Sequence, residues 1–100
     1  MNQKTVYILN KASHDFSAAE RFGKLVYCTE GTLDKLDVAQ MYRQLSAALS
    51  ASSPDDYILL TSLTSLCSVA SAIMADQHGQ VNFLIHTSNG YVERTLYLNN

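Results

Sequence analysis

The sequence predicts an α/β (α+β) fold: one globular domain, residues 1–100, with a single mixed sheet of about five strands and two main helices. Five short apolar runs rich in β-branched and aromatic residues are spaced along the chain, and two longer stretches between them have helical character. The order is β-β-α-β-α-β-β, so two strand–helix–strand units predict right-handed parallel crossovers. A tight turn joins the last two runs and predicts a C-terminal antiparallel hairpin.

The composition indicates a surface with few charges. Of the 100 residues, 47% are apolar and 16% are charged, and the formal net charge is −2. The charged share is well below the usual ~25%. We therefore expect part of the surface to be covered in a homo-oligomer, a dimer or larger. A neutral surface rich in Ser and Thr is the alternative.

Several classes of function are disfavoured. No run of Lys or Arg offers a basic patch, which makes nucleic acid an improbable partner. The chain has no signal peptide and no apolar stretch of membrane length, which predicts a cytoplasmic protein without membrane contact. Cys28 and Cys67 lie far apart in apolar segments and read as reduced core residues. We expect no metal and no cofactor, because the histidines lack ligand spacing: His14, His78 and His86.

Two strands and a short helical segment are expected first. Thr5 to Asn10 is apolar on both faces and predicts an inner strand. The spacing from Ser17 to Glu20 matches a capping box and predicts one or two helical turns ending at Gly23. Lys24 to Thr29 is a second strand, again apolar on both faces. We expect Tyr27 to be in the core with the other strand tyrosines, Tyr7 and Tyr57.

The first main helix is expected to open at Asp37. Asp37 can cap it, with Gln40 three residues on, and Leu36 can pack against Met41 as a hydrophobic staple. Apolar residues at helical spacing predict one buried face, namely Val38, Met41, Tyr42, Leu45, Ala48 and Leu49.

The second helix, from about Ser62 to His78, has an unusual composition. A turn containing Asp55-Asp56 and a short strand, 57–60, precede it, and Gly79 is placed to end it. No charged residue occurs between Thr61 and Ala75. Such a helix is either sandwiched inside the domain or pressed against a partner. The residues we expect at an interface are Ser65, Ser68, Tyr91 and Tyr97.

The closing hairpin is predicted from Val81 to Leu98. The run 81–86 is a strand, Ser88-Asn89-Gly90 supplies the turn, and 91–98 alternates apolar and polar residues. The alternation is typical of an edge strand.

The loop after the first strand is the first candidate site, with Asn10, Ser13, His14 and Asp15. Ligands in open α/β sheets bind outside the carboxyl ends of the strands. His14 and Asp15 can in principle act as a general base and its orienter, with Ser13 or Ser17 as nucleophile. Sequence neighbours rarely point at each other, however. The competing interpretation is that Asp15 makes a local turn bond and His14 is solvated or contacts a partner.

The second candidate is the start of the second helix, with Thr61, Ser62 and Ser65. Free amides and hydroxyls at a helix start can hold a phosphate or carboxylate. The segment lacks the glycines of a dinucleotide fingerprint and the lysine of a P-loop. Simple capping by Thr61 or Ser62 is the competing interpretation.

Several stretches resemble a group of small proteins encoded by tailed bacteriophages and prophages, over nearly the whole chain. They are His14-Asp15-Phe16-Ser17, Phe22-Gly23, Leu25-Val26-Tyr27, Thr29-Glu30-Gly31, the run 55–62, His78-Gly79 and Val92-Glu93-Arg94. No activity is assigned to that group, so the resemblance implies no catalytic residue. It implies a phage protein made in the host cytoplasm, of the short accessory kind that binds a host protein or sequesters a signal nucleotide.

These observations favour a non-enzymatic binding protein that self-associates and binds a host factor. The alternative is a protein that binds or sequesters a small ligand, a nucleotide or phosphate, with the His14 loop and the Thr61–Ser65 helix start. A small hydrolase that uses His14 and Asp15 is the third interpretation.

Overall fold

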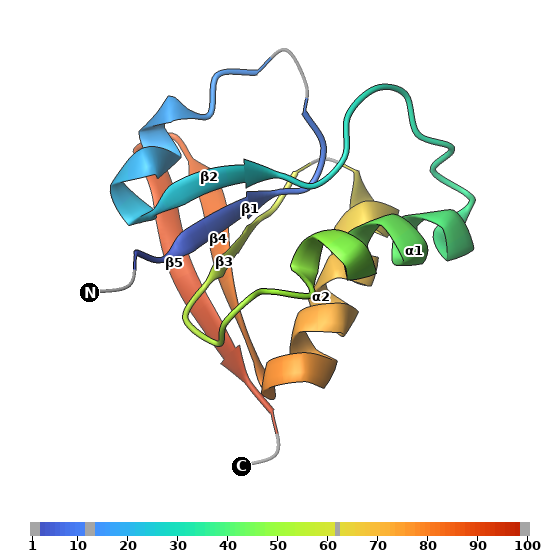
Figure 1. The fold of residues 1–100 in the computed structure, drawn as a ribbon. Helices are drawn as coiled ribbons and strands as arrows, with labels where there is room; N and C mark the ends of the chain where they lie inside the picture. The colour runs from blue at the N-terminus through green and yellow to red at the C-terminus, as the bar shows by residue number, and fades with distance from the viewer. Residues whose placement is uncertain (1–2, 12–13, 62, 99–100) are drawn as a thin grey trace.

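The computed structural model describes residues 3–11, 14–61 and 63–98, and its centre is a five-stranded sheet in the order β2-β1-β3-β4-β5 (Figure 1). Four strands are parallel, and β5 runs antiparallel to β4. The strands are β1 (Thr5–Ile8), β2 (Lys24–Tyr27), β3 (Tyr57–Leu59), β4 (Gln80–Thr87) and β5 (Gly90–Tyr97). The mixed sheet and the C-terminal antiparallel hairpin confirm the predicted fold class.

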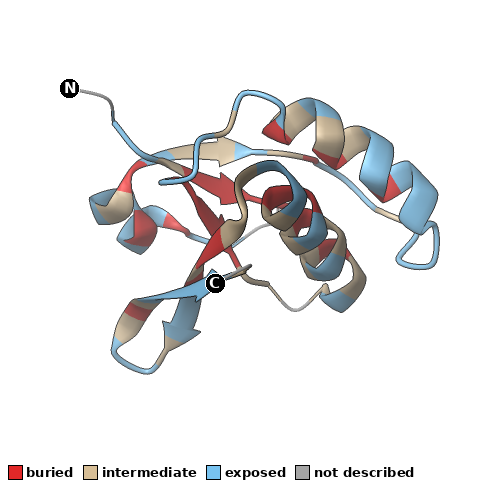
Figure 2. Ribbon diagram, turned by 90° about the horizontal axis from the view of Figure 1, so that it is seen from below, coloured by how far each residue is buried: buried red, intermediate tan, exposed pale blue. Residues whose placement is uncertain are grey.

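Helices cover both faces of the sheet. The helices α1 (Val38–Leu49) and α2 (Thr64–His78) lie on one face, and the short 3-10 helix η1 (Ser17–Phe22) lies on the other (Figure 1). The central strands β1 and β3 are buried on both sides because Tyr7 and Ile58 face α1 and α2, whereas Val6 and Leu59 face η1. Figure 2 shows the buried positions in these strands and on the helix sides that face them.

The strand β2 differs from the prediction because it lies at an edge of the sheet. It pairs only with β1, and its residues are exposed or half-buried. Tyr27 is therefore 43% exposed, and the expectation that it packs in an inner strand is wrong. A strand that is apolar on both faces reads as an inner strand, but its place in the sheet depends on the order in which the strands pair.

The caps of the helices follow the predictions in part. Asp37 precedes α1 and accepts a hydrogen bond from the Gln40 amide at 3.0 Å, which confirms the predicted cap. The staple is wrong, because Leu36 is 83% exposed. The capping box before η1 is also wrong, because Ser17 lies inside the helix and its amide donates to the Asp15 carboxylate.

One side of α1 is more exposed than its periodicity predicts. Met41 and Leu45 are buried as expected, whereas Val38 is 53% exposed and Tyr42 is 59% exposed. Helical spacing identifies an apolar face but does not say how much of it the neighbouring elements cover. Here α2 and the sheet cover only part of that face, and Tyr42 is not a core residue.

The serine hydroxyls of α2, a helix with no charged residue before Asp76, are hydrogen-bonded within the chain. Its buried side packs in the core, and Gly79 ends it at φ +70°, as predicted. The Ser65 hydroxyl donates to the Lys35 carbonyl at 2.8 Å, and the Ser68 hydroxyl donates to the Thr64 carbonyl at 2.9 Å. These bonds leave the serine hydroxyls paired within one chain.

The amino end of the sheet is closed by a buried acidic residue. Asp56 lies just before β3 and is 6% exposed. Its carboxylate accepts hydrogen bonds from the Thr5 and Ser53 amides, both at 2.9 Å. Asp56 thus forms part of the predicted turn with its carboxylate buried.

A buried amide extends this contact across the sheet. The Asn82 side-chain NH₂ donates to the Pro54 carbonyl at 2.7 Å and to the Asp56 carbonyl at 3.0 Å. Its side-chain oxygen accepts a hydrogen bond from the Thr95 hydroxyl at 2.8 Å. The buried polar groups at this end therefore bind one another, as buried polar groups generally must.

Candidate functional site

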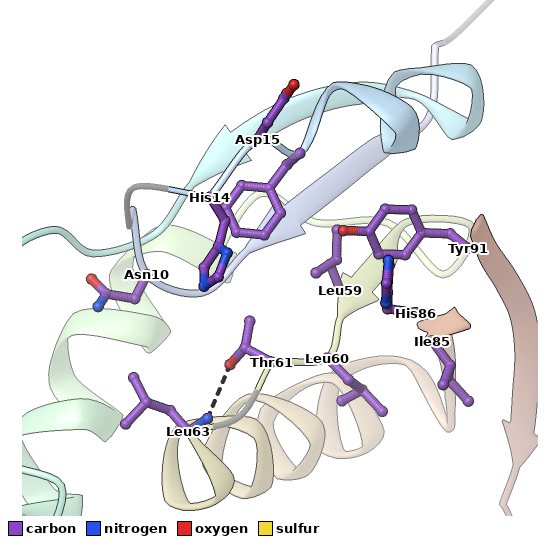
Figure 3. Close-up of a pocket in the computed structure, with 11 residues that line it drawn as sticks. Asn10, His14, Asp15, Leu59, Leu60, Thr61, Leu63, Ile85, His86 and Tyr91 are labelled. Atoms are coloured by element: carbon purple, nitrogen blue, oxygen red, sulfur yellow. Dashed lines mark hydrogen bonds between the residues drawn. The ribbon is translucent and has the colours of Figure 1, made fainter. Parts of the chain in front are cut away.

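A cavity of about 640 Å³ opens at the carboxyl ends of β1 and β3 (Figure 3). The chain passes from β1 to β2 on one side and later to β3 on the other, so these ends flank the switch point of the sheet. Ligands in open α/β sheets bind at that place. Two walls and a floor line the cavity. The loop after β1 and the β4–β5 hairpin form the walls, and the junction between β3 and α2 forms the floor.

The loop after β1 contributes His14, Asp15 and Phe16 to the first wall. Phe16 is buried and anchors the loop, and the His14 ring packs against it edge-on with centroids 6.1 Å apart. The Asp15 carboxylate accepts a hydrogen bond from the Ser17 amide at 2.9 Å. That bond, with a smaller contribution from the Ser17 side chain, lowers the pKa of Asp15.

Asp15 and His14 do not form a catalytic pair in this arrangement. Figure 3 shows the Asp15 carboxylate directed away from the His14 ring, and within the described residues the structure records no hydrogen bond between them. The local turn bond of Asp15 is the one that the competing interpretation predicted. Without an orienting carboxylate, the base–nucleophile arrangement lacks its third group.

The junction between β3 and α2 forms the floor, which is mainly apolar. Leu59, Leu60 and Leu63 line it together with Thr61. The Thr61 hydroxyl accepts a hydrogen bond from the Leu63 amide at 3.3 Å, drawn as a dashed line in Figure 3. This bond closes the turn before α2, whose first residue is Thr64. Thr61 therefore stabilises the helix entry but does not cap the helix in the usual sense.

The β4–β5 hairpin supplies the opposite wall. His86 and Tyr91 are direct partners in the register of the two strands, and their rings meet edge-to-face with centroids 5.2 Å apart. Burial raises the pKa of Tyr91, and the negative charge of Asp15 adds to this rise. The phenol therefore stays neutral at physiological pH. Arg21 of η1 donates to the Tyr91 carbonyl at 3.1 Å and ties this wall to the helix beside it.

The structure brings together four of the seven ligand-site residues expected from the sequence. Asn10, His14, Asp15 and Thr61 line the cavity, although Asn10 also binds the Thr29 hydroxyl and the Gly31 carbonyl. Ser65 lies elsewhere and binds the Lys35 carbonyl. Ser13 and Ser62 lie outside the described residues.

The four expected interface residues do not share one surface. Ser65 and Ser68 belong to α2, on one face of the sheet. Tyr91 lies on the opposite face, where it is 8% exposed and lines the cavity. Tyr97 is 61% exposed on the edge strand β5. The structure thus places these residues in three regions: the helix α2, the cavity and the exposed end of β5.

Sequence reasoning assigned Tyr91 to an interface and did not identify six other lining residues, namely Phe16, Leu59, Leu60, Leu63, Ile85 and His86. One signal was available for the hairpin. The tight turn before Gly90 sets the register, so His86 must stand opposite Tyr91. That the pair faces the His14 loop depends on the strand order, which the sequence left open.

A second, shallower groove of about 700 Å³ runs between α1 and α2. The exposed Val38 and Tyr42 line one side, and Val69 and Ile73 line the other. Asp76 is the charged residue of this lining.

The described part of the chain offers neither a metal cluster nor a membrane-spanning helix. Among residues 3–11, 14–61 and 63–98, no three His, Cys, Asp or Glu side chains gather in a group that could hold a metal ion. In the same residues, no helix combines the length and apolarity needed to span a bilayer.

The strand order and the cavity define a small open-sheet α/β protein with a crevice at its switch point. A family model described as Phage Pam3 gp32-like protein matches residues 4–97, and the chain belongs to this family. This match confirms the resemblance to small phage proteins. Searches of curated proteins and of solved structures found no match.

Proposed function

We propose that this phage protein is a non-enzymatic accessory protein that binds a small molecule in the cavity at the carboxyl ends of β1 and β3, in the cytoplasm of the host. The observation that carries the proposal is the meeting of the His14 loop and the Thr61 junction, which the sequence indicated separately. The cavity volume of about 640 Å³ falls within the usual range for small-molecule sites, roughly 300–1,000 Å³.

The side chains around the cavity suit binding better than catalysis. Asp15 is engaged by the Ser17 amide, so His14 lacks an orienting carboxylate. The Thr61 hydroxyl accepts the Leu63 amide. What remains open toward the cavity is apolar surface with two imidazoles and one phenol, a combination that binds and orients a ligand.

Nuclear magnetic resonance with a diverse fragment set tests the proposal. The set contains planar, aliphatic and phosphorylated compounds, and we expect binding fragments to shift the amide signals of residues 14–16 and 85–91. If no fragment shifts these signals, the proposal is wrong. Turnover of any compound, with loss of that turnover in His14→Ala, would replace binding with catalysis.

The second candidate function is that the protein self-associates and binds a host factor. The groove between α1 and α2 favours it, because Val38 and Tyr42 are 53% and 59% exposed there. Exposed apolar surface of this kind marks interaction sites. Size-exclusion chromatography with light scattering tests the assembly: we expect twice the 11.1 kDa chain mass or more. An 11.1 kDa particle at micromolar concentration would refute it, and Tyr42→Ser should shift a dimer toward monomer.

A further inference from the structure

We propose that the cavity binds a planar heteroaromatic ring of the nucleobase class and leaves any attached phosphate outside, an inference that rests on the proposed small-molecule site. Three observations support this choice of ligand: the aromatic residues contributed by two different segments, the apolar floor, and the sign of the charge beside the cavity.

Aromatic rings line the cavity from two walls. The His14–Phe16 pair comes from the loop after β1, with rings inclined by 62°, and the His86–Tyr91 pair comes from the hairpin, with rings inclined by 70°. Figure 3 shows His14 on one side of the space and His86 with Tyr91 on another. Planar bases stack on such side chains with useful affinity, because every base has a π-face.

The floor between these walls gives a planar ring an apolar surface to cover. Leu59, Leu60 and Leu63 come from the β3–α2 junction, and Ile85 adds to them from β4. At the edge of this surface the Tyr91 phenol offers a neutral hydroxyl. A heteroaromatic ring meets both requirements, with apolar faces and a polar edge that can hydrogen-bond.

The charge beside the cavity argues against a phosphate as the recognised group. Among the described lining residues there is no Lys or Arg, and the one carboxylate is Asp15. The Ser17 amide that bonds Asp15 also keeps this carboxyl ionised by lowering its pKa. A phosphate placed at this mouth would meet a like charge and no fixed cation.

Calorimetric titration with the four common ribonucleosides, their 5′-monophosphates and triphosphates, and inorganic phosphate tests the inference. We expect at least one nucleoside to bind one per chain, its monophosphate to bind at least fivefold more weakly, and phosphate alone to give no heat. If affinity rises with each added phosphate, or if phosphate alone binds, the inference is wrong. If only aliphatic fragments of the earlier set bind, the inference falls while the proposed function stands, and if no compound binds, both fall.

Variants separate the stacking contribution from the charge contribution. His86→Ala should weaken the nucleoside at least tenfold, whereas Tyr97→Leu, which changes an exposed tyrosine on the neighbouring strand β5, should not change its affinity. Asp15→Asn keeps an oxygen for the Ser17 amide but removes the charge, so it should narrow the gap between nucleoside and monophosphate. An unchanged affinity in His86→Ala, or an unchanged gap in Asp15→Asn, would contradict the inference.

Discussion

The two ends of the sheet use polar side chains in opposite ways. At the amino end, Asp56 and Asn82 are buried, and their side-chain oxygens and nitrogen bind neighbouring groups. At the carboxyl end, His14 and His86 are exposed, and in the described part of the chain neither ring has a hydrogen-bond partner. Paired buried groups hold a fold together, and open ones remain available to a ligand. The polar groups that stabilise the fold and the polar groups left open to solvent therefore lie at opposite ends of the sheet.

Removal of the buried carboxylate should have the largest effect on stability. In Asp56→Ala the Thr5 and Ser53 amides lose a charged acceptor, and we expect the free energy of unfolding to fall by about 3 kcal/mol. Urea denaturation followed by circular dichroism measures it. Asp55→Ala is the matched control, because Asp55 is exposed and should change stability by about 0.5 kcal/mol or less. Equal losses in the two variants would contradict the contrast between the two ends.

Close backbone packing at the amino end predicts the next largest effect. A Cβ at Gly23 would lie 2.3 Å from the Lys4 carbonyl oxygen, where β1 and β2 begin. Gly23→Ala should therefore cost about 2 kcal/mol of stability through forced backbone shifts. The comparison variant is Gly31→Ala, which has open space but φ +84° and should cost about 1 kcal/mol. A Gly23 variant as stable as the Gly31 variant would show that this end tolerates movement.

The dependence of stability on alkaline pH tests the burial of two ionisable side chains, Cys28 and Tyr57. Burial raises the pKa of Cys28 from 9.0 to about 12, and burial with the Glu93 hydrogen bond raises that of Tyr57 from 10.0 to about 12. Above pH 9 the unfolded chain loses protons that the folded chain retains, so the free energy of unfolding should fall as the pH rises from 9 toward 12. Urea midpoints at pH 8, 9, 10 and 11 measure this fall. Tyr57→Phe should flatten it above pH 10, and constant midpoints would refute the prediction.

The smallest effect on stability is expected at the carboxyl end. His86→Ala removes an exposed ring that has no hydrogen-bond partner among the described residues, so the free energy of unfolding should change by about 0.5 kcal/mol or less. The same denaturation experiment applies. A loss comparable to that of Asp56→Ala would assign His86 a structural role and end the division between the two ends.

Much of the secondary structure could be predicted because it depends on neighbours in sequence. The Asp37 cap and the Gly79 helix end each need only one turn of backbone. The cavity was also partly predictable, because residues that follow two parallel strands lie at the same edge of the sheet. Asn10 and Thr61 therefore lie near each other if β1 and β3 are parallel neighbours, as they are.

What could not be predicted depends on the strand order and on covering contacts. The order places β2 at an edge, which exposes Tyr27, and places the hairpin beside the His14 loop, which turns His86 into a cavity residue. Tyr42 fits a helical apolar pattern, yet nothing in one helix reveals how far its neighbours extend over it. The predicted capping box does not form because the Ser17 amide, which the Glu20 carboxylate would accept in a capping box, donates to the Asp15 carboxylate instead.

The bond from Arg21 to the Tyr91 carbonyl has a consequence for the order in which the protein assembles. It joins the segment after the first strand to the last strand, 70 positions apart in the chain. During synthesis, the loop after β1 and the β3–α2 junction are made before the hairpin that completes the cavity. The cavity is therefore complete only when residue 91 is in place, and capture of a ligand by a growing chain would report that the hairpin has joined the sheet.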